Sequence, residues 1–379
     1  MNFDLTQEQT MIMKMVRDFA QGEIAPKAAD VDRTARFPLE TFKQLGELGL
    51  LGLPISEEYG GAGADTISYA LAVEEIGRAC GSTGLSYAAH VSLGCGPLYY
   101  FGTEEQKRTH LVPLATGQAL GSFGLTEPNA GSDAGGTQTR AVRDGDEFVV
   151  NGSKAYITNA GYAKTIVVTA VVGKKDGRNQ IGAFIVPTDT PGFSVTRTYE
   201  KMGLRGSNTV ELALEDVRIP AANILGSETG GFKQFLYTLD GGRISIGALS
   251  VGIAQAAYEA ALRYAKERTQ FGQAISKFQA IQFKLTDMAM HIELARTMVL
   301  KAAWLKDQHR PFTQESAMAK LFASEICMRT CDQAVQIHGG AGYVQDFPVE
   351  RYMRDAKLME IGEGTSEIQR MVIARQIGC

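Results

Sequence analysis

The spacing of apolar residues changes twice along the chain, and this pattern limits the possible folds more than any single motif does. Residues 1–119 and 229–379 repeat apolar side chains at the three- and four-residue steps of helices, whereas residues 120–228 contain short β-branched runs. The 379 residues are also too many for one ordinary hydrophobic core. The sequence therefore predicts an α+β protein with an N-terminal helical domain, a middle antiparallel β domain and a C-terminal four-helix bundle.

Within residues 1–119, three helical stretches can be placed. Positions 39, 42, 45 and 48 are apolar and share one helical stripe. A glycine-rich break at 60–63 precedes a second helical stretch through 71–76. A third helix is expected after Gly102, where Thr103 can cap a first turn that contains two glutamates.

Residues 120–228 have the texture of strands. β-branched residues dominate the runs 166–172, 181–186 and 210–214. The pairs Asp144-Gly145 and Asp176-Gly177 lie between such runs and are typical of hairpin turns. Because no long helical segments alternate with the strands, we expect antiparallel pairing and not a parallel βαβ sheet.

Residues 229–379 contain the longest helical pattern. Apolar residues follow alternating steps of three and four at Phe278, Ile281, Leu285, Met288, Ile292, Ala295 and Val299. The stretch 246–257 repeats this spacing earlier in the chain. Such spacing is typical of the seam of a helical bundle.

Composition excludes several classes of protein. The net charge of −4 gives no reason to expect binding to nucleic acid or to an anionic membrane. No apolar run approaches the roughly 18 residues of a membrane span, and the N-terminus lacks the apolar region of a secretion signal. The five cysteines are scattered, so we expect buried reduced thiols and neither a disulfide nor a metal site. We therefore expect a cytoplasmic protein, or a mitochondrial matrix protein if this is a mature eukaryotic form.

Common cofactor and nucleophile motifs are missing. The chain has no G-x-G-x-x-G after a predicted strand, no P-loop, no H-E-x-x-H and no G-x-S-x-G. Nicotinamide-dependent and ordinary hydrolytic chemistry are therefore disfavoured.

Three segments combine glycine with small polar residues in otherwise apolar surroundings. They are 124–136, 336–343 and 361–370. Glycine allows the backbone to approach a ligand closely, and the N–H groups at a helix N-terminus attract anions. Each segment alone could equally be a loop with a helix cap.

Together these segments resemble the signatures of the acyl-CoA dehydrogenase family, and the likeness extends over essentially the whole chain. Residues 124–136 and 336–355 match two family signatures, and 363–367 matches the region that carries the catalytic base in the short- and medium-chain branches. Residues 154–159 and 268–272 match two further flavin contacts. The resemblance implies FAD as cofactor and an acyl-CoA thioester as substrate.

In this family a base removes the α-proton of the acyl chain while a hydride leaves its β-carbon, which gives a trans-2-enoyl-CoA. The resemblance assigns the base to Glu363, which lies between two glycines. Burial is expected to raise the pKa of Glu363 towards neutrality, as suits a general base. The isovaleryl branch carries its base on an earlier helix, where this chain has Gly242.

The resemblance also implies contacts for cofactor and substrate. The expected FAD-binding residues are Leu125, Thr126, Tyr156, Thr158, Arg268, Phe271, Gln279, Gln336, Gly339, Gly340, Thr365 and Glu367. Of these, Arg268, Phe271 and Gln279 are expected to reach the FAD of a neighbouring subunit. The expected substrate-binding residues are Ser132, Asp240, Arg243 and Gly364.

The implied partners are electron-transfer flavoprotein as electron acceptor and further copies of the chain in a homotetramer, a dimer of dimers. Three alternatives on the same scaffold remain: an acyl-CoA oxidase, a flavin monooxygenase or nitroalkane oxidase, and a non-catalytic assembly protein. The chain lacks the long C-terminal extension of the oxidases and keeps Glu363, which disfavours all three.

The acyl chain remains open at this point, and with it the choice between fatty acid β-oxidation and branched-chain amino acid catabolism. Short-chain relatives usually have tyrosine where this chain has Gly362, and residues 84–90 and 203–208 resemble the isovaleryl branch. Gly362 either widens the acyl cavity or provides a backbone conformation with positive φ.

Overall fold

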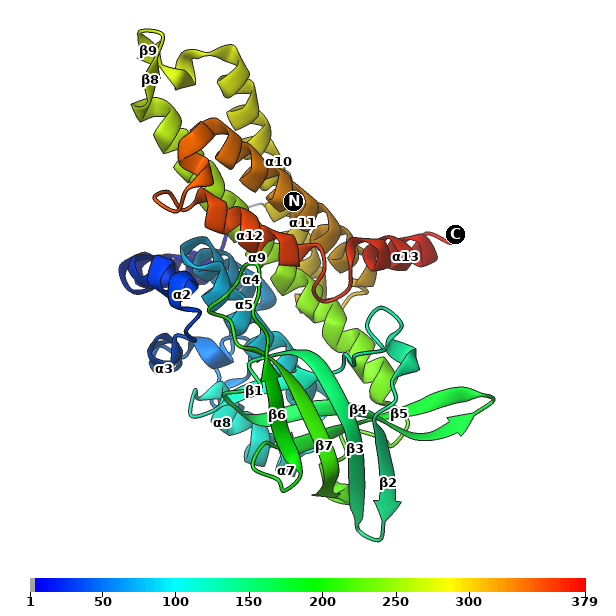
Figure 1. Ribbon diagram of the computed structural model, residues 1–379. Helices are drawn as coiled ribbons and strands as arrows, with labels where there is room; N and C mark the ends of the chain where they lie inside the picture. The colour runs from blue at the N-terminus through cyan, green and yellow to red at the C-terminus, as the bar shows by residue number, and fades with distance from the viewer. Residues whose placement is uncertain (1–3) are drawn as a thin grey trace.

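The computed structural model describes residues 4–379 and has three parts (Figure 1). A β-sheet occupies one end of the molecule, the long C-terminal helices extend towards the other end, and the N-terminal helices lie beside both. The architecture confirms the predicted order of helices, sheet and helices. The first strand of the sheet begins at Leu120 and the first long C-terminal helix at Gly231, and the domain boundaries at 1–119, 120–228 and 229–379 stay a prediction.

The N-terminal helices are mostly short. They are α1 (Gln7–Phe19), α2 (Ala28–Thr34), α3 (Leu39–Glu47), α4 (Thr66–Ala79), α5 (Gly81–Ala88), α6 (Gly96–Phe101), α7 (Glu104–Gln106) and α8 (Val112–Ala115). The expected cap of α7 is confirmed, because Thr103 Oγ1 accepts from Gln106 N at 3.2 Å. The stripe on α3 holds only in its middle: Phe42 and Leu45 are buried, while Leu39 and Leu48 at the two ends are exposed.

Seven strands form the sheet of the middle part. They are β1 (Leu120–Gly124), β2 (Arg140–Asp144), β3 (Glu147–Thr158), β4 (Ala163–Lys175), β5 (Arg178–Pro187), β6 (Phe193–Thr198) and β7 (Thr209–Pro220). Their order is β1-β4-β2-β3-β7-β6, with β5 also paired to β4. The expected turns at Asp144-Gly145 and Asp176-Gly177 close the β2–β3 and β4–β5 hairpins.

The expectation of purely antiparallel pairing is wrong at one edge of the sheet. β1 runs parallel to β4, and β2 meets β4 through one parallel bridge at Arg140 and Val171. A parallel pair needs a crossover connection, and this one consists of the loop after β1 and the β2–β3 hairpin instead of a helix. The remaining four pairings in this sheet are antiparallel.

Long helices dominate the C-terminal part. They are α9 (Gly231–Glu267), α10 (Gln279–Asp307) and α11 (Thr313–His338), followed by the shorter α12 (Val349–Met359) and α13 (Ser366–Gln376). A small hairpin of β8 (Thr269–Gln270) and β9 (Gln273–Ala274) joins α9 to α10. The predicted seam on α10 is confirmed from Leu285 to Val299, where its apolar positions are buried, while Phe278 and Ile281 at the start are half-buried.

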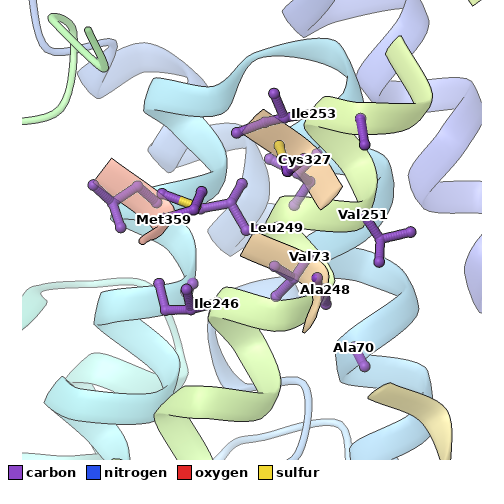
Figure 2. Close-up of a cluster of buried hydrophobic side chains, with 14 of the residues drawn as sticks. Ala70, Val73, Ile246, Ala248, Leu249, Val251, Ile253, Cys327 and Met359 are labelled. Carbon is purple, nitrogen blue, oxygen red and sulfur yellow. The ribbon is translucent and has the colours of Figure 1, made fainter. Parts of the chain in front are cut away.

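Helix α9 lies at the centre of a core shared by both helical parts (Figure 2). Its residues Ile246, Leu249 and Ile253 pack with Val73 of α4 and Cys327 of α11. By length and composition α9 could cross a membrane, but 78% of its most apolar window is buried inside the protein. Burial in the bundle therefore accounts for its apolar character.

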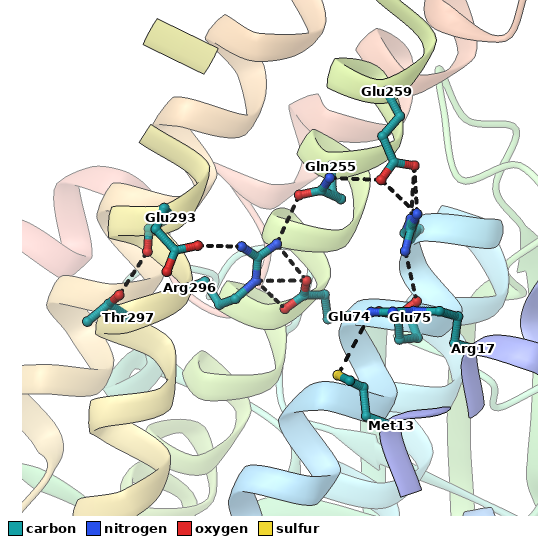
Figure 3. A network of polar contacts seen from close by, with 10 residues as sticks. Met13, Arg17, Glu74, Glu75, Gln255, Glu259, Glu293, Arg296 and Thr297 are labelled. Carbon is teal, nitrogen blue, oxygen red and sulfur yellow. Dashed lines mark hydrogen bonds and ion pairs between the residues drawn. The ribbon is translucent and has the colours of Figure 1, made fainter. Parts of the chain in front are cut away.

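A network of charged and amide side chains also crosses this helical interface (Figure 3). Arg296 of α10 donates to Glu74 of α4 at 2.8 Å and to Gln255 of α9 at 2.9 Å. Arg78 of α4 binds Glu259 of α9 at 2.7 Å. Such partly buried pairs make α4, α9 and α10 depend on one another, since loss of one partner leaves the other without compensation.

Candidate active site

A cavity of about 970 Å³ lies where the sheet, the N-terminal helices and the C-terminal helices meet. Its walls come from α5, α9, α12, α13, the strands β1, β3 and β7 and the loops around them. Nine of the residues predicted for the site line it: Leu125, Thr126, Ser132, Tyr156, Thr158, Arg243, Glu363, Gly364 and Thr365. Segments more than 200 residues apart in the sequence thus meet around one space.

Glu363 lies in the loop between α12 and α13. Its backbone is left-handed, with φ of +53°. The residue borders the cavity, yet its Oε2 is shielded from solvent and has no hydrogen-bond partner among residues 4–379. Burial raises the pKa of Glu363 to about 7, although the nearby charges of Lys320 and Arg243 act in the opposite direction. A carboxyl with this pKa can exchange a proton at neutral pH.

Gly242 of α9 faces the same carboxyl. A Cβ atom built on Gly242 would lie 1.9 Å from Glu363 Oε2, so no larger residue fits there while Glu363 keeps this position. Residues 242 and 363 are the two positions at which different branches of the family carry the base. In this structure they therefore lie next to each other, and a side chain at either one would occupy the same space. Gly242 leaves that place empty, and the Glu363 carboxyl occupies it.

Arg243 follows Gly242 and is almost fully buried. Its Nη1 donates to Asp240 at 2.5 Å, and Thr313 donates to the other oxygen of Asp240 at 2.6 Å. Arg243 Nε has no partner among residues 4–379. Asp240, predicted to contact substrate, does not line the cavity, and its visible contacts orient Arg243 instead.

A buried ion pair supports the wall that carries Leu125 and Thr126. Lys154 Nζ lies 2.7 Å from Glu127 Oε1 and 3.1 Å from the Leu125 carbonyl. Glu127 also accepts the backbone N–H of Thr139 at 3.0 Å. Both charged residues lie inside segments that the sequence comparison had selected, but neither was predicted as a site residue. Each could have been recognised in the sequence as an isolated charged residue within a run of uncharged residues.

Tyr156 presents an aromatic face to the cavity. It lies at positive φ on β3, is 64% exposed and stacks on Tyr199 with ring centroids 4.8 Å apart. Thr158, two residues later, borders the same space. Tyr199 was not predicted, because it follows β6 at a distance of 43 residues from Tyr156.

The other predicted FAD contacts lie outside this cavity. They are Arg268, Phe271, Gln279, Gln336, Gly339, Gly340 and Glu367, and all seven are exposed. The first three lie at the β8–β9 end of the molecule, far from the sheet in Figure 1, and Phe271 is 94% exposed. This chain therefore does not bring these residues to its own cavity.

Lys320 and Gln369 do not line the cavity but support the turn that carries Glu363, and the sequence reasoning missed both. Lys320 Nζ and Gln369 Nε2 both donate to the carbonyl of Gly364 at 2.8 Å, and both side chains are completely buried. The available signal for Lys320 was a single lysine among the apolar residues of 317–323. Such a lysine rarely lies in a core without a polar partner.

Comparison with known protein families covers nearly the whole chain. Residues 6–118, 122–217 and 229–378 match the families described as the N-terminal, middle and C-terminal domains of acyl-CoA dehydrogenase. A probable acyl-CoA dehydrogenase of Bacillus subtilis (strain 168) is 73% identical over 378 residues, which is 100% of both chains. The short-chain specific acyl-CoA dehydrogenase of Clostridium acetobutylicum is 49% identical over 377 residues, again covering 100% of both.

Solved structures of acyl-CoA dehydrogenases also superpose on nearly the whole chain. Butyryl-CoA dehydrogenase from Megasphaera elsdenii superposes with a TM-score of 0.98 at 46% identity and covers 100% of both chains. An acyl-CoA dehydrogenase from Bacillus anthracis complexed with FAD superposes with a TM-score of 0.94 at 36% identity, covering 99% of this chain and 67% of that one.

Proposed function

The chain belongs to the acyl-CoA dehydrogenase family of FAD-dependent oxidoreductases, and on this premise we propose that it converts a short-chain acyl-CoA to the trans-2-enoyl-CoA with Glu363 as the base. The observation that carries the proposal is the Glu363 carboxyl, which borders the cavity with one oxygen unpaired. Its pKa of about 7 leaves a substantial fraction ionised at neutral pH and able to accept a proton.

The fit of FAD rests on the lining of this cavity. Leu125, Thr126, Tyr156 and Thr158 supply a wall with an aromatic face and hydroxyl groups, and Glu363 borders the same space. A cavity of about 970 Å³ is at the upper end of the size usual for ligand sites. When bound, FAD supplies the acceptor for the hydride that leaves the β-carbon.

The protein's own contribution to the reaction is proton removal and charge stabilisation. We assign to Glu363 the α-proton and to its backbone N–H a hydrogen bond to the thioester oxygen, which gains negative charge as the proton leaves. The walls beside it are largely apolar and keep water from the reacting carbons. Arg243 and Ser132, which line the same cavity, are assigned to the CoA part.

A short acyl chain is supported by the named substrates of similar proteins, the short-chain specific and butyryl-CoA dehydrogenases. A methyl branch remains compatible with Gly362. Gly362 lines the cavity. It does not have positive φ, so the other explanation for this glycine, a backbone conformation that only glycine adopts easily, is wrong. A Cβ atom at Gly362 would have no neighbour closer than 3.5 Å, which leaves local space beside the base.

We further propose electron-transfer flavoprotein as the electron acceptor, a homotetramer as the working assembly and the cytoplasm as the location. The exposed position of Arg268, Phe271 and Gln279 supports an assembly in which they serve a neighbouring subunit's site. Exposed apolar side chains on α10, including Phe283, Met290 and Leu294, provide surface that a second copy can cover.

Cys80, Cys95, Cys327 and Cys331 are buried free thiols, while Cys379 is exposed.

The test uses the purified yellow protein under anaerobic conditions. Butyryl-, isovaleryl- and octanoyl-CoA are added in turn, and bleaching of the flavin absorbance is followed. Rapid bleaching by butyryl-CoA is expected. Absence of bleaching by every thioester would contradict the proposed reaction, and bleaching that is fastest with octanoyl-CoA would contradict the short-chain assignment.

A further inference from the structure

The turn that carries Glu363 has an unusual backbone. Glu363 and Gly364 are both left-handed, with φ of +53° and +95°. Glycine adopts this region freely, but a residue with a Cβ atom does so at an energetic cost and needs support from its surroundings. Glu363 therefore keeps its orientation only because other groups hold the turn.

Two buried side chains provide that support through one backbone atom. Lys320 Nζ, from the first third of α11, donates to the Gly364 carbonyl at 2.8 Å. Gln369 Nε2, from α13, donates to the same carbonyl at 2.8 Å and to the Glu363 carbonyl at 3.3 Å. The carbonyl that follows the base is thus fixed from two helices.

Lys320 also brings a positive charge to the base. Besides each other, the charged groups that act on Glu363 or Lys320 are Arg243 of α9, Glu360 after α12 and Glu367 of α13. The charge of Asp240 acts on Arg243, and the neutral Tyr69 of α4 faces the same region. Arg243 is already paired with Asp240. Within residues 4–379 the ammonium of Lys320 binds the Gly364 carbonyl and forms no ion pair with a carboxylate, so its charge is less compensated than that of Arg243.

The two ionisable groups affect each other in the expected directions. Burial lowers the pKa of Lys320 to about 8, while the charge of Glu363 raises it. Burial raises the pKa of Glu363 to about 7, and the charge of Lys320 lowers it. At neutral pH the ammonium therefore favours the ionised form of the carboxyl, which is the form that accepts a proton.

We propose that Lys320 is a positioning residue for the base: its ammonium holds the Gly364 carbonyl, and so the turn, and places a positive charge beside the Glu363 carboxylate. This inference rests on the proposed function of Glu363 as the base. Lys320 acts through Glu363 and is not assigned any contact with the substrate.

The test compares Lys320→Met, Lys320→Gln and a control variant. Methionine removes both the charge and the hydrogen bond, whereas glutamine keeps a donor for the Gly364 carbonyl and removes only the charge. Arg329→Met is the matched control, because it removes a positive charge from the exposed side of the same helix. Each holoenzyme is checked for FAD content and thermal stability. The pH profile of kcat/KM and the infrared titration of the Glu363 carboxyl, assigned by difference from Glu363→Gln, are then measured.

Both Lys320 variants are expected to move the acid limb of kcat/KM and the carboxyl titration upward by about one pH unit, which is about tenfold lower kcat/KM on the acid side. Arg329→Met should leave both unchanged. If Lys320→Met fails to fold, Lys320→Gln decides the question. An unshifted acid limb in a folded, FAD-loaded Lys320 variant overturns the inference. Failure of the wild type to reduce its flavin, or full activity of Glu363→Gln, would instead overturn the proposed base.

Discussion

Glu363 meets the cavity at the point where α9 has no side chain to compete with it. Gly242 leaves the space, the left-handed turn aims the carboxyl into it, and burial gives the carboxyl a pKa of about 7. The motif around residue 363 pointed to Glu363 as the base, which stays a prediction, and the expected direction of its pKa shift is confirmed. The support from Lys320 and Gln369 was not predictable, because nothing in the spacing of the sequence connects α11 to the turn between α12 and α13.

The rate of flavin reduction is expected to rise with pH through about pH 7. The pKa of Glu363 is raised, so the carboxyl is protonated and inactive as a base below that value and ionised above it. Stopped-flow measurement of flavin bleaching at subsaturating concentrations of a short-chain acyl-CoA would show the rise, because the rate then follows the pKa of the free enzyme.

The Glu363→Gln enzyme serves as the control for this pH dependence. It should retain FAD and bind the thioester while losing about a hundredfold or more of the rate, and its residual rate should not follow the same limb. A variant that keeps more than about a tenth of the wild-type rate would point to a different base.

Gly362→Tyr is expected to narrow the acyl cavity. Residue 362 lines the cavity and does not have positive φ, so a side chain there meets space and not backbone strain. Overpacking costs about 1–3 kcal/mol, and only substrates that use the filled space should feel it. We expect kcat/KM to fall much more for isovaleryl- and octanoyl-CoA than for butyryl-CoA. Equal losses for all three would show that the residue does not select the acyl chain.

At the scale of elements, strand pairing was only partly accessible from the sequence. The hairpin turns at Asp144-Gly145 and Asp176-Gly177 identified the antiparallel neighbours, because a short turn requires them. The parallel contact between β1 and β4 is long-range, and its crossover contains another hairpin where a helix would usually give a signal. The α9 and α10 seams were predictable because they depend on local periodicity.

Glu127→Gln is expected to loosen the wall between β1 and β3. Burial alone would raise the pKa of Glu127, but the charge and hydrogen bond of Lys154, with hydrogen bonds from Thr137 and Thr139, lower it to about 2. The pair therefore stabilises the fold above the unfolded value of about 4.3, and this stabilisation is lost as pH falls through about 2.

The substitution leaves Lys154 buried without its partner, which costs about 3–5 kcal/mol. A lower melting temperature and weaker FAD retention are expected at neutral pH. Glu147→Gln removes an exposed pair with Arg218 in the same sheet and should cost about 1 kcal/mol or less. Equal effects of the two substitutions would contradict a special role for the buried pair.

At the scale of the whole molecule, the chain divides its predicted FAD contacts between its own cavity and a distant end. The family resemblance predicted this separation for Arg268, Phe271 and Gln279, which were expected to reach a neighbouring subunit's FAD. It did not predict that Gln336, Gly339, Gly340 and Glu367 also lie outside the chain's own cavity, because local spacing does not encode where a loop lies relative to the cavity. Leu125 and Thr126 border the cavity, whereas Arg268 and Phe271 lie exposed beside β8.

Arg268→Ala is therefore expected to lower flavin occupancy without unfolding the monomer, because its side chain is exposed and supports no core. Absorbance of the bound flavin and light scattering would report occupancy and assembly together. Arg263→Ala, on the exposed side of α9, is the control and should change neither. A monomer that holds its full complement of FAD would contradict an intersubunit role for Arg268.

Helix α9 runs without interruption from the sheet to the hairpin, and it carries Gly242 and Arg243 near one end and Arg268 just beyond the other. At about 1.5 Å per residue, the stretch between Arg243 and Arg268 spans about 38 Å. The helix thus fixes the distance between the cavity, which Arg243 lines, and the exposed hairpin end, where Arg268 is proposed to contact a neighbouring subunit's FAD. Glu363, Gly242 and Arg268 all follow β7 in the sequence, so recombination between β7 and α9 would transfer the three residues together. A chimaera of two relatives joined there would combine one parent's acyl-binding end with the other parent's flavin wall.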